Sequence, residues 1–426
     1  PSTFDGVGNF RSEGGAIAAY GGSTVHLRDS RFENNFASTK GGAVIIDDDS
    51  NQGGSSEFSS INTTYHNNQI ESVIVQTSFG VYVESVNGGA IFLRGLNRID
   101  FEASIFDSNM AKVNGECCNN QGGAVNIDGV GHLTIKNSRF INNKIFTPDN
   151  NQGGNALGGA MNIVNFRNPV NIQNNLFISN IAEGGLDNSG GGAWGGNGGA
   201  LRFAQHDNAT DPEKSKIIIS NNTFFGNKSL SKSANASARA GAIESDDRAA
   251  LIVFNNIFWQ NEAQNNNAFD AMYNDLTANQ STVVSSNSFD TPEYAAALSV
   301  KGNNNFSSDP KFVLDGSIDS LALSDASAMI GKGTLELEGY RAPAFDILGK
   351  PRPTQLYNPD LGAYENSALI SLYPDRVKNL QSDAGNRYVH LYWDENAENN
   401  ISHYAIYMST ESNFQPTVED SIGETS

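Results

Sequence analysis

Two short phrases alternate along residues 14–290, and each has its own pattern of apolar and polar positions. In the first, Phe-x-x-Asn, the positions five and seven residues before the Phe are apolar, whereas the positions beside them are mixed. Alternation with a period of two predicts β-strands with one buried face. The phrase occurs at Phe32/Asn35, Phe106/Asn109, Phe140/Asn143, Phe177/Asn180, Phe224/Asn227 and Phe258/Asn261, with Tyr65/Asn68 as a variant and Phe289 without its Asn.

The second phrase is Gly-Gly-Ala followed by an apolar residue. The positions one and three residues after the Ala are apolar, as at Ile91 and Leu93, so this phrase predicts a second strand with an inward face. Its paired glycines allow a tight corner and a close approach of neighbouring segments. The Ala of the phrase is Ala16, Ala43, Ala90, Ala124, Ala160, Ala200 or, where Ala replaces the first Gly, Ala242.

Strands that recur in this way cannot bury their apolar faces alone, so consecutive repeats must stack. A Ser or an Asn stands two residues before each Phe, from Ser30 to Asn287, and we expect this column to form a ladder of side-chain hydrogen bonds. Asn suits it because its amide both donates and accepts, and because it tolerates left-handed backbone geometry. The pattern predicts an all-β fold, a right-handed parallel β-helix over residues 1–305. We expect the insertions to form loops at 48–57, 112–121, 145–157, 184–197 and 228–239.

The alternating phrases resemble the repeats of polymorphic outer-membrane proteins and related β-helical surface adhesins. This resemblance implies the fold and says little about function, because the pattern encodes packing. A second group of phrases resembles the choice-of-anchor Q domain, a module that closes many secreted bacterial β-helices ahead of a surface-anchoring element. These phrases are Asp309-Pro310-Lys311-Phe312, Gly349-Lys350-Pro351-Arg352-Pro353 and Asp360-Leu361-Gly362-Ala363-Tyr364-Glu365, whereas the family's Pro-Ala-Ile-Asp phrase stands here as Ser327-Ala328-Met329-Ile330.

The second resemblance implies a C-terminal capping module over residues 306–370, which covers a sheet edge that would otherwise promote aggregation. Beyond it, apolar and polar residues alternate around Val389, Leu391 and Trp393, as in antiparallel strands. This part is similar to the opening of a fibronectin type III domain, so we expect residues 371–426 to begin a β-sandwich. Such a module is usually a spacer or docking element, and we assign it no chemistry.

Composition and charge narrow the function classes. Only 38% of the 426 residues are apolar and 43 are Gly, which suits an elongated repeat of short strands. The net charge of -20 disfavours nucleic acid and anionic membranes as partners. No apolar stretch approaches the ~20 residues of a membrane helix. We expect a mature or truncated piece of a longer protein, extracellular or at the cell surface, with secretion or anchoring machinery acting through a missing C-terminal region.

The adjacent Cys117 and Cys118 cannot form a long-range disulfide. They are either free thiols or a vicinal disulfide, and an oxidising compartment favours the disulfide. The acidic run 47–49 and the pair Asp315/Asp319 offer carboxylates for calcium, but they lack the spacing that wraps one ion. We therefore expect no cofactor and no metal, with calcium as the open alternative.

The outward side chains of the Gly-Gly-Ala strand, two and four residues after the Ala, include amides and charges. A parallel face of this kind can hold extended polysaccharide. We expect Arg94 to lie near Asp128 and Arg202 near Glu244, so ion pairs on a solvated face are the alternative explanation. Trp194, in a Gly-rich loop, either stacks on a sugar ring or covers the edge of a coil. The predicted ligand-binding residues are Arg94, Asn126, Asp128, Asn162, Trp194, Arg202, Glu244 and Asp246.

Catalysis is the competing interpretation. A resemblance to β-helical polysaccharide lyases implies a basic residue and a cation or calcium beside a uronate carboxylate. Parity places His132 and Lys136 on a different strand from Arg94, which spoils such a cluster. A hydrolase needs paired carboxylates, and the adjacent Asp246 and Asp247 are expected to face opposite sides of a strand. The candidate basic residues are Arg94, Arg202, His206, His132 and Lys136.

The sequence thus favours a non-catalytic adhesin or glycan-binding protein whose partner is extracellular polysaccharide or another cell surface. A polysaccharide lyase and a structural stalk that displays other modules are the alternatives. All three share one fold, and no catalytic residue is assigned.

Overall fold

The computed structural model describes the chain in ranges separated by gaps. These ranges are 2–4, 10–48, 55–72, 74–77, 80–114, 119–148, 154–186, 195–204, 216–233, 238–245, 250–264, 270–273, 282–292, 302–317, 319–353, 358–366, 377–394, 403–410 and 421–425. The chain divides into two compact units, Pro1–Ala368 and Leu369–Ser426. The elements that span these ranges are β-strands, which confirms the all-β prediction for the described residues.

Three large sheets build the first unit. The wide sheet has 14 strands: β3 (Ile17–Tyr20), β4 (Thr24–Arg28), β7 (Val44–Asp47), β8 (Glu57–Ile61), β13 (Ile91–Glu102), β17 (Val125–Lys136), β21 (Met161–Phe166), β22 (Val170–Gln173), β26 (Leu201–Ala204), β27 (Lys216–Ser220), β30 (Ile243–Ser245), β31 (Ala250–Phe254), β34 (Met272–Tyr273) and β35 (Val283–Ser285). The aromatic sheet has 8: β5 (Arg31–Glu33), β9 (Thr64–His66), β14 (Ile105–Asp107), β18 (Arg139–Ile141), β23 (Leu176–Ile178), β28 (Thr223–Phe225), β32 (Ile257–Trp259) and β36 (Ser288–Phe289). The narrow sheet has 7: β6 (Phe36–Ala37), β10 (Gln69–Glu71), β15 (Met110–Lys112), β19 (Lys144–Phe146), β24 (Ile181–Gly184), β29 (Lys228–Ser231) and β33 (Glu262–Ala263).

Smaller sheets complete the unit. A 3-stranded edge sheet contains β16 (Asn119–Gln121), β20 (Asn155–Leu157) and β25 (Gly196–Asn197), all within segments predicted to be loops, so that part of the loop prediction is wrong. The loops there leave short extended pieces next to the Gly-Gly-Ala corner, where they can pair from one repeat to the next. The 2-stranded sheets of the unit are β1 (Ser2–Phe4) with β2 (Phe10–Ser12), β11 (Ile74–Thr77) with β12 (Gly80–Val83), and β37 (Glu336–Leu337) with β38 (Tyr340–Arg341).

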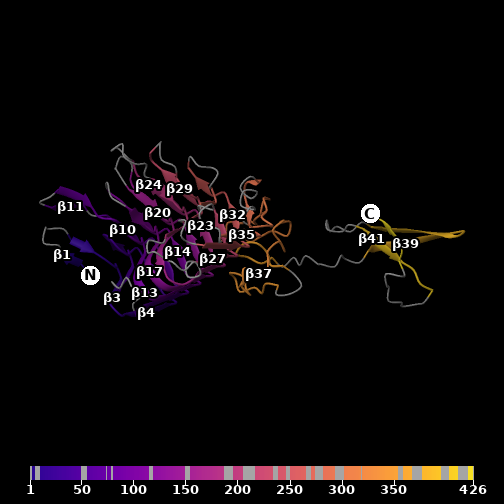
Figure 1. The fold of residues 1–426 in the computed structure, drawn as a ribbon, viewed down its shortest axis with the longest axis horizontal. Helices are drawn as coiled ribbons and strands as arrows, with labels where there is room; N and C mark the ends of the chain where they lie inside the picture. Colours follow the sequence, from indigo (N-terminus) through magenta and orange to yellow (C-terminus); the bar gives the residue numbers. More distant parts are fainter. Residues whose placement is uncertain are drawn as a thin grey trace. The chain divides into compact units, whose positions relative to one another are not determined.

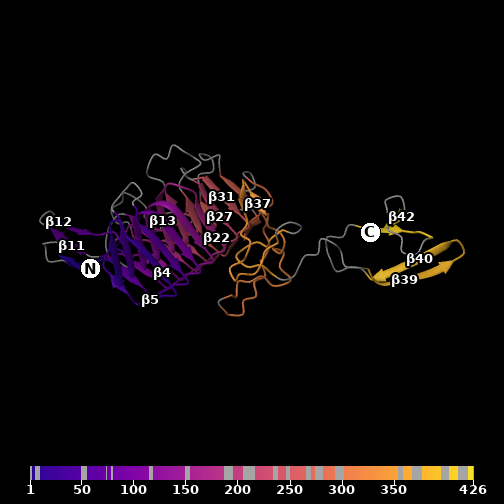
Figure 2. The same ribbon diagram turned by 90° about the horizontal axis from the view of Figure 1, so that it is seen from below.

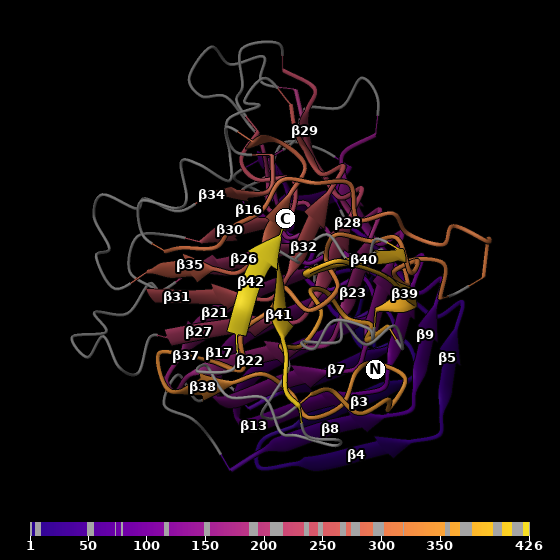
Figure 3. The ribbon, with the colours of Figure 1, turned by 90° about the vertical axis from the view of Figure 1, so that its right-hand side faces the viewer.

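Each repeat forms what we call a rung, and the strands of one rung pair in parallel with those of the next. In the aromatic sheet, for example, Phe106 of β14 pairs with Phe140 of β18, which pairs with Phe177 of β23. Figures 1 and 2 show the rungs following one another in sequence order. Figure 3 shows the aromatic sheet (β5, β9), the wide sheet (β31, β35) and the narrow sheet (β29) on different sides of the stack. This repeated parallel architecture fits a parallel β-helix.

Two middle rungs have one long strand in the wide sheet where two were expected. The long strands β13 and β17 pair along nearly all of their length. His132 and Lys136 lie on β17 and Arg94 lies on β13, so they are on different strands, as predicted, although the two strands are neighbours in one sheet. The glycines Gly95 and Gly129 have φ values of 74° and 76°, so the chain can bend at these points without leaving the ladder.

The aromatic residues of the Phe-x-x-Asn phrase form one column inside the stack. Neighbouring rings are parallel to within 8°, and their centroids lie 4.6–5.2 Å apart. The hydroxyl of Tyr65 meets Oγ of buried Ser60 at 3.0 Å, which accommodates the one Tyr. The predicted repeat register is thereby confirmed. The column runs through Phe32, Tyr65, Phe106, Phe140, Phe177, Phe224, Phe258 and Phe289.

The predicted ladder two residues before the Phe is present among the asparagines, whereas the hydroxyls of Ser30, Ser104 and Ser138 donate to backbone oxygens and not to the next side chain of the column. Nδ2 of Asn175 donates to Oδ1 of Asn222 at 2.9 Å, and the same bond recurs down to Asn287. The left-handed conformation, however, falls one residue earlier than predicted, on Asn174 with a φ of 55°. The reason is that the ladder residue points inward while its neighbour forms the corner. Each Asn-Asn pair thus divides the two tasks.

A second ladder is formed by the Asn of the Phe-x-x-Asn phrase itself. Nδ2 of Asn143 donates to Oδ1 of Asn180 and to the backbone oxygen of Phe106, both at 2.9 Å. The Asn180 side chain in turn repeats this pattern with the next rung. These amides are buried, so their hydrogen bonds satisfy polar groups that would otherwise be costly inside the stack.

The paired glycines have separate roles. Gly88 adopts a φ of 73°, which favours Gly, and so forms the corner. A Cβ on Gly89 would lie 2.0 Å from the backbone oxygen of Gly123 and 2.8 Å from the backbone of Met110. The second Gly therefore allows both the next rung and the narrow sheet to approach. Both predicted roles of the glycines are confirmed.

Residues 302–306 add a last partial rung, because Phe306 bridges to Ser288 and Asn287 donates to Asn305 at 3.3 Å. The following residues 309–366, which we call the return segment, fold back along the outside of the stack. They pack on outward apolar side chains of the aromatic and wide sheets. These contacts gather Leu321, Ile347, Ala363 and Tyr364 around Leu176; Leu323, Met329, Ile330 and Leu361 around Ile257; and Leu337, Tyr340 and Ala342 around Ile218, Ile252 and Phe254.

The second unit has two antiparallel strand pairs. β39 (Lys378–Gly385) pairs with β40 (Tyr388–Asp394), and β41 (Tyr404–Tyr407) pairs with β42 (Ser421–Thr425). The predicted antiparallel pairing is confirmed for these strands. The rings of Trp393 and Tyr404 meet edge to face with centroids 5.3 Å apart.

Candidate functional site

The predicted outward column two residues after the Ala is in register. Asn126, Asn162, Arg202 and Glu244 are successive partners across β17, β21, β26 and β30. Their predicted exposure is wrong, because the exposed fractions of Asn126, Asn162 and Glu244 are 1%, 0% and 4%. Neighbouring polar residues enclose this column, as Gln121 of the edge sheet does by accepting a 3.3 Å hydrogen bond from Asn162.

The buried column is internally paired. Nδ2 of Asn162 donates to Oδ1 of Asn126 at 2.8 Å. Nε of Arg202 donates to Glu244 at 3.2 Å, as predicted, and its Nη1 donates to Asn162 at 3.2 Å. Because this charged pair is so enclosed, its main effect is to offset the free-energy cost of burying each of the two charges. These four residues are therefore largely buried and hydrogen-bonded to one another, which indicates a structural role.

The second predicted column gives a different result. Arg94 binds Asp47 of the preceding rung through two hydrogen bonds of 2.6 Å and 2.8 Å. Asp128 is the register partner of Arg94 on the following rung, as predicted, but its carboxylate accepts a 2.8 Å hydrogen bond from Asn165. The side chain of Arg94 is 31% exposed and that of Asp47 is 7% exposed, so the pair is open to solvent on the arginine side.

Tyr20, Asp47 and Arg94 each stand four residues after the Ala of their phrase, so the repeat pattern places them in one column, but it does not identify the residues that join them. Glu13 and Lys40 each stand directly before a Gly-Gly corner and bridge to one another. Nζ of Lys40 lies 3.7 Å from Glu13 and 3.8 Å from Asp47. We call Glu13, Tyr20, Lys40, Asp47 and Arg94 the outer cluster. The sequence feature that could have identified Glu13 and Lys40 is their shared position directly before the paired glycines.

An aromatic component belongs to the outer cluster. Tyr20 is 48% exposed, and its hydroxyl donates to Glu13 at 3.2 Å. Partial burial, with the charge and hydrogen bond of Glu13, raises the pKa of Tyr20 above its ordinary value, so the phenol stays protonated at neutral pH. Nζ of Lys40 also lies 5.1 Å from the ring centroid of Phe92, a cation–π distance. The cluster presents an exposed ring beside charged donors and acceptors.

Other predicted site residues lie outside the described residues: Trp194, Asp246, Asp247, His206, Cys117 and Cys118. Of the remaining candidate bases, Lys136 lies 3.2 Å from Glu102 in an ion pair, and His132 of β17 is the register partner of Arg98 on β13. Within the described ranges, no group of three or more His, Cys, Asp or Glu side chains could hold a metal ion. Asp319, one of the carboxylates considered for calcium, accepts hydrogen bonds from Arg139 and Tyr364, each at 2.9 Å.

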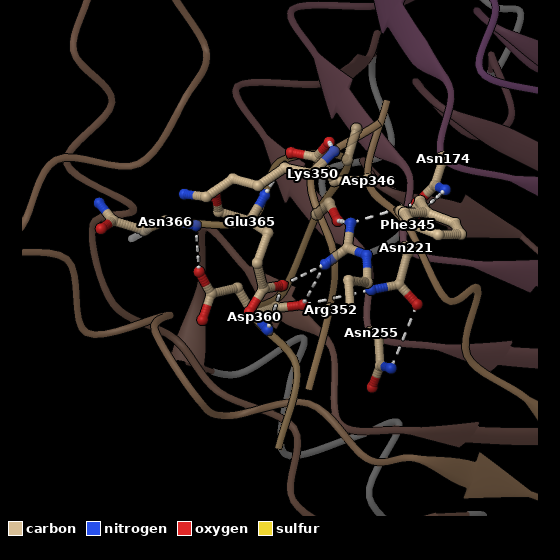
Figure 4. A network of polar contacts seen from close by, with 12 residues as sticks. Asn174, Asn221, Asn255, Phe345, Asp346, Lys350, Arg352, Asp360, Glu365 and Asn366 are labelled. Carbon is tan, nitrogen blue, oxygen red and sulfur yellow. Dashed lines mark hydrogen bonds and ion pairs between the residues drawn. The ribbon is translucent and has the colours of Figure 1, made fainter. Parts of the chain in front are cut away.

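A second polar cluster joins the return segment to the rungs (Figure 4). Nη1 of Arg352 donates to Glu365 at 2.7 Å, and its Nη2 donates to Asn174 at 3.1 Å and to the backbone oxygen of Gly362 at 2.9 Å. Burial, then the charge of Asp360, raises the pKa of Glu365 to about 7, against the opposing effect of Arg352. We call this the return junction. Its buried groups bond mainly to one another, with only Nε of the Arg352 guanidinium lacking a hydrogen-bond partner among the described residues, which indicates a structural role.

Corner asparagines of three rungs also hold the return segment. They donate to its backbone: Asn174 to Phe345 at 2.6 Å, Asn221 to Asp360 at 3.2 Å and Asn255 to Thr334 at 2.8 Å. Sequence reasoning missed these contacts, although the Asn-Asn pairs marked the positions. The first Asn of each pair binds the return segment and the second continues the internal ladder.

Comparisons with known proteins found no matching family model, no similar curated protein and no similar solved structure. No helix among the described residues is both long and apolar enough to cross a membrane.

Proposed function

We propose that the protein is a secreted or cell-surface right-handed parallel β-helix that binds extracellular glycan without cleaving it. In this proposal a choice-of-anchor Q-like module comprises the return segment, and a fibronectin type III-like domain follows it. The observation that carries the function is the outer cluster, where the half-exposed ring of Tyr20 lies beside Glu13 and the partly exposed Arg94–Asp47 pair.

The chemistry of the outer cluster suits sugar recognition. An exposed tyrosine ring can stack on the apolar face of a sugar, and neighbouring carboxylate and guanidinium groups can bind its hydroxyls. The cluster extends over three successive rungs, because Tyr20, Asp47 and Arg94 are register partners in β3, β7 and β13. Rungs spaced ~4.8 Å apart can therefore contact an extended chain along its length.

The pairing of the charged groups favours binding over catalysis. A lyase needs a group that accepts a proton near neutral pH. Tyr20 has a raised pKa, and Lys40 and Arg94 lie 3.8 Å and 2.6 Å from the carboxylate of Asp47, so both are already engaged in ion pairs. These ion-paired groups can orient a ligand, and their pairing with Asp47 favours a binding role over that of a base.

A glycan array probed with the full chain tests the proposal. We expect binding to a defined group of extracellular polysaccharides, lost in Tyr20→Ala and partly retained in Tyr20→Phe. The matched control is His26→Ala, an exposed side chain of the same rung on β4. Binding that survives Tyr20→Ala would remove the outer cluster from the proposal, and Trp194→Ala then tests the Gly-rich loop.

A further inference from the structure

A pocket of about 340 Å³ lies at the other end of the first unit, between the last rungs and the return segment. Its rung side is formed by Ser285, Ser286, Asn303, Asn304 and Phe306, and its other side by residues 331–334, Leu337 and Asn358. None of the described residues that line it is acidic, and one, Lys332, is basic. The chain as a whole has a net charge of -20, so a pocket whose described lining carries no acidic side chain differs from the chain's average in favouring an anionic ligand.

The walls of this pocket are fixed by the return segment's own hydrogen bonds. The amide of Thr334 donates to Asn255 at 2.7 Å, and that of Gly333 donates to the backbone oxygen of Pro359 at 2.8 Å. On the rung side, Oγ of Ser285 donates to the side chain of Asn303 at 2.8 Å. The pocket is therefore formed before any ligand arrives, which lowers the entropy cost of binding.

The lining offers the groups that a sugar ring requires. Amides and hydroxyls predominate, and Phe306 and Leu337 supply apolar surface. Lys332 is exposed and forms no ion pair with any described residue, in contrast to Lys40 and Lys350, whose ammonium groups have partners. A free ammonium group in a pocket without carboxylates favours an anionic substituent on the ligand.

We propose that this pocket binds an acidic sugar unit, a pyranose ring that carries a carboxylate, with Lys332 neutralising the carboxylate. The inference rests on the proposed glycan-binding function and adds a second contact point with a defined ligand class. It places the acidic unit at the last rungs, whereas the outer cluster belongs to the first three.

Saturation-transfer NMR and calorimetry with the full chain test this assignment, with glucuronate as the probe, glucose as the neutral ring and acetate as the carboxylate without a ring. Glucuronate is expected to bind more tightly than either. Lys332→Met is expected to weaken glucuronate binding about tenfold, to the level of glucose, because it removes a charge-assisted contact. Asn358→Asp, at an exposed position, is expected to weaken it by repulsion. The matched control is Lys311→Met, an exposed lysine of the same segment that does not line the pocket.

Equal binding of glucuronate and glucose, or glucuronate binding that Lys332→Met leaves unchanged, overturns the assignment. Failure of the pocket is distinguishable from failure of the proposed function. If glucuronate does not bind but the array still shows capture that depends on Tyr20, only the pocket assignment falls. If glucuronate binds through Lys332 while Tyr20→Ala has no effect on the array, the outer cluster falls and the pocket stands.

Discussion

The guanidinium of Arg352 donates to the carboxylate of Glu365 at 2.7 Å, and the two side chains are only 1% and 6% exposed. This pair links two phrases of the return segment that lie thirteen residues apart, and the same guanidinium reaches Asn174 on a rung. Around it stand further carboxylates, Asp346 and Asp360. Such a buried cluster is stable only while its partners remain together, which makes its individual members sensitive to substitution.

Arg352→Met is expected to destabilise the first unit by about 3–5 kcal/mol, because it leaves Glu365 buried without its partner. Chemical denaturation measures the loss, and limited proteolysis is expected to cut first in the return segment. The control is Arg341→Met, whose ion pair with Glu336 joins side chains that are 84% and 50% exposed, so little change is expected. Equal effects of the two substitutions would contradict the structural role of the return junction.

The pH dependence of stability follows from Glu365. Its pKa is raised from 4.5 to about 7 in the folded protein, so the folded state holds the proton more tightly than the unfolded state. The stabilisation is complete below pH 4.5 and is lost as the pH rises through about 7. The melting temperature should therefore fall between pH 5 and pH 8, and Glu365→Gln should flatten this slope. A slope that Glu365→Gln leaves unchanged assigns the titration to other groups.

The asparagine ladders are expected to be sensitive at any interior rung. Asn180 donates to Asn227 and to the backbone of Phe140, and it accepts from Asn143. Asn180→Ala leaves several buried groups unpaired and should cost about 3 kcal/mol or more in unfolding free energy. Asn171→Ala, on the outward side of β22, is the control and should cost less than about 1 kcal/mol. Similar costs for both would mean that the ladder contributes little.

The ring column makes a separate prediction. Phe177 is fully buried between Phe140 and Phe224, so Phe177→Ala opens a cavity and should cost about 3–5 kcal/mol. Phe36→Ala removes a ring that is 55% exposed in the first rung and should have a much smaller effect. Urea denaturation of both variants provides the comparison. A small loss for Phe177→Ala would indicate that the rings are not the core of the stack.

The features that the sequence predicted correctly are those that repeat. Each phrase carries its ring and its amide at fixed positions, so stacking places equivalent side chains next to each other. Phe140 thus meets Phe177, and Asn175 meets Asn222. The long strands β13 and β17 were not predicted, because a single Gly inside a strand could equally have ended it. The Arg94–Asp47 pair was missed because register alone gives each residue two neighbours and does not choose between them.

The burial of the outward column could not be predicted from the alternation of apolar and polar residues either. Parity tells which side of a strand a residue such as Asn162 faces, but it does not show what packs on that side, as Gln121 of the edge sheet does on Asn162. One signal was overlooked. The outward positions of the aromatic sheet change from charged residues, such as Arg31 and Glu33, to apolar ones, such as Leu176 and Ile178. That change marks where the return segment packs.

The most direct test of the account is a combined binding and product measurement on the polysaccharide that the array ranks first. The account predicts saturable binding by the full chain, loss of that binding in Tyr20→Ala, and recovery of the polysaccharide with unchanged chain length and no new absorbance from unsaturated ends. Shortened chains or unsaturated ends that accumulate with time, and that persist in Tyr20→Ala, would contradict it and identify the protein as a glycan-cleaving enzyme with its site elsewhere.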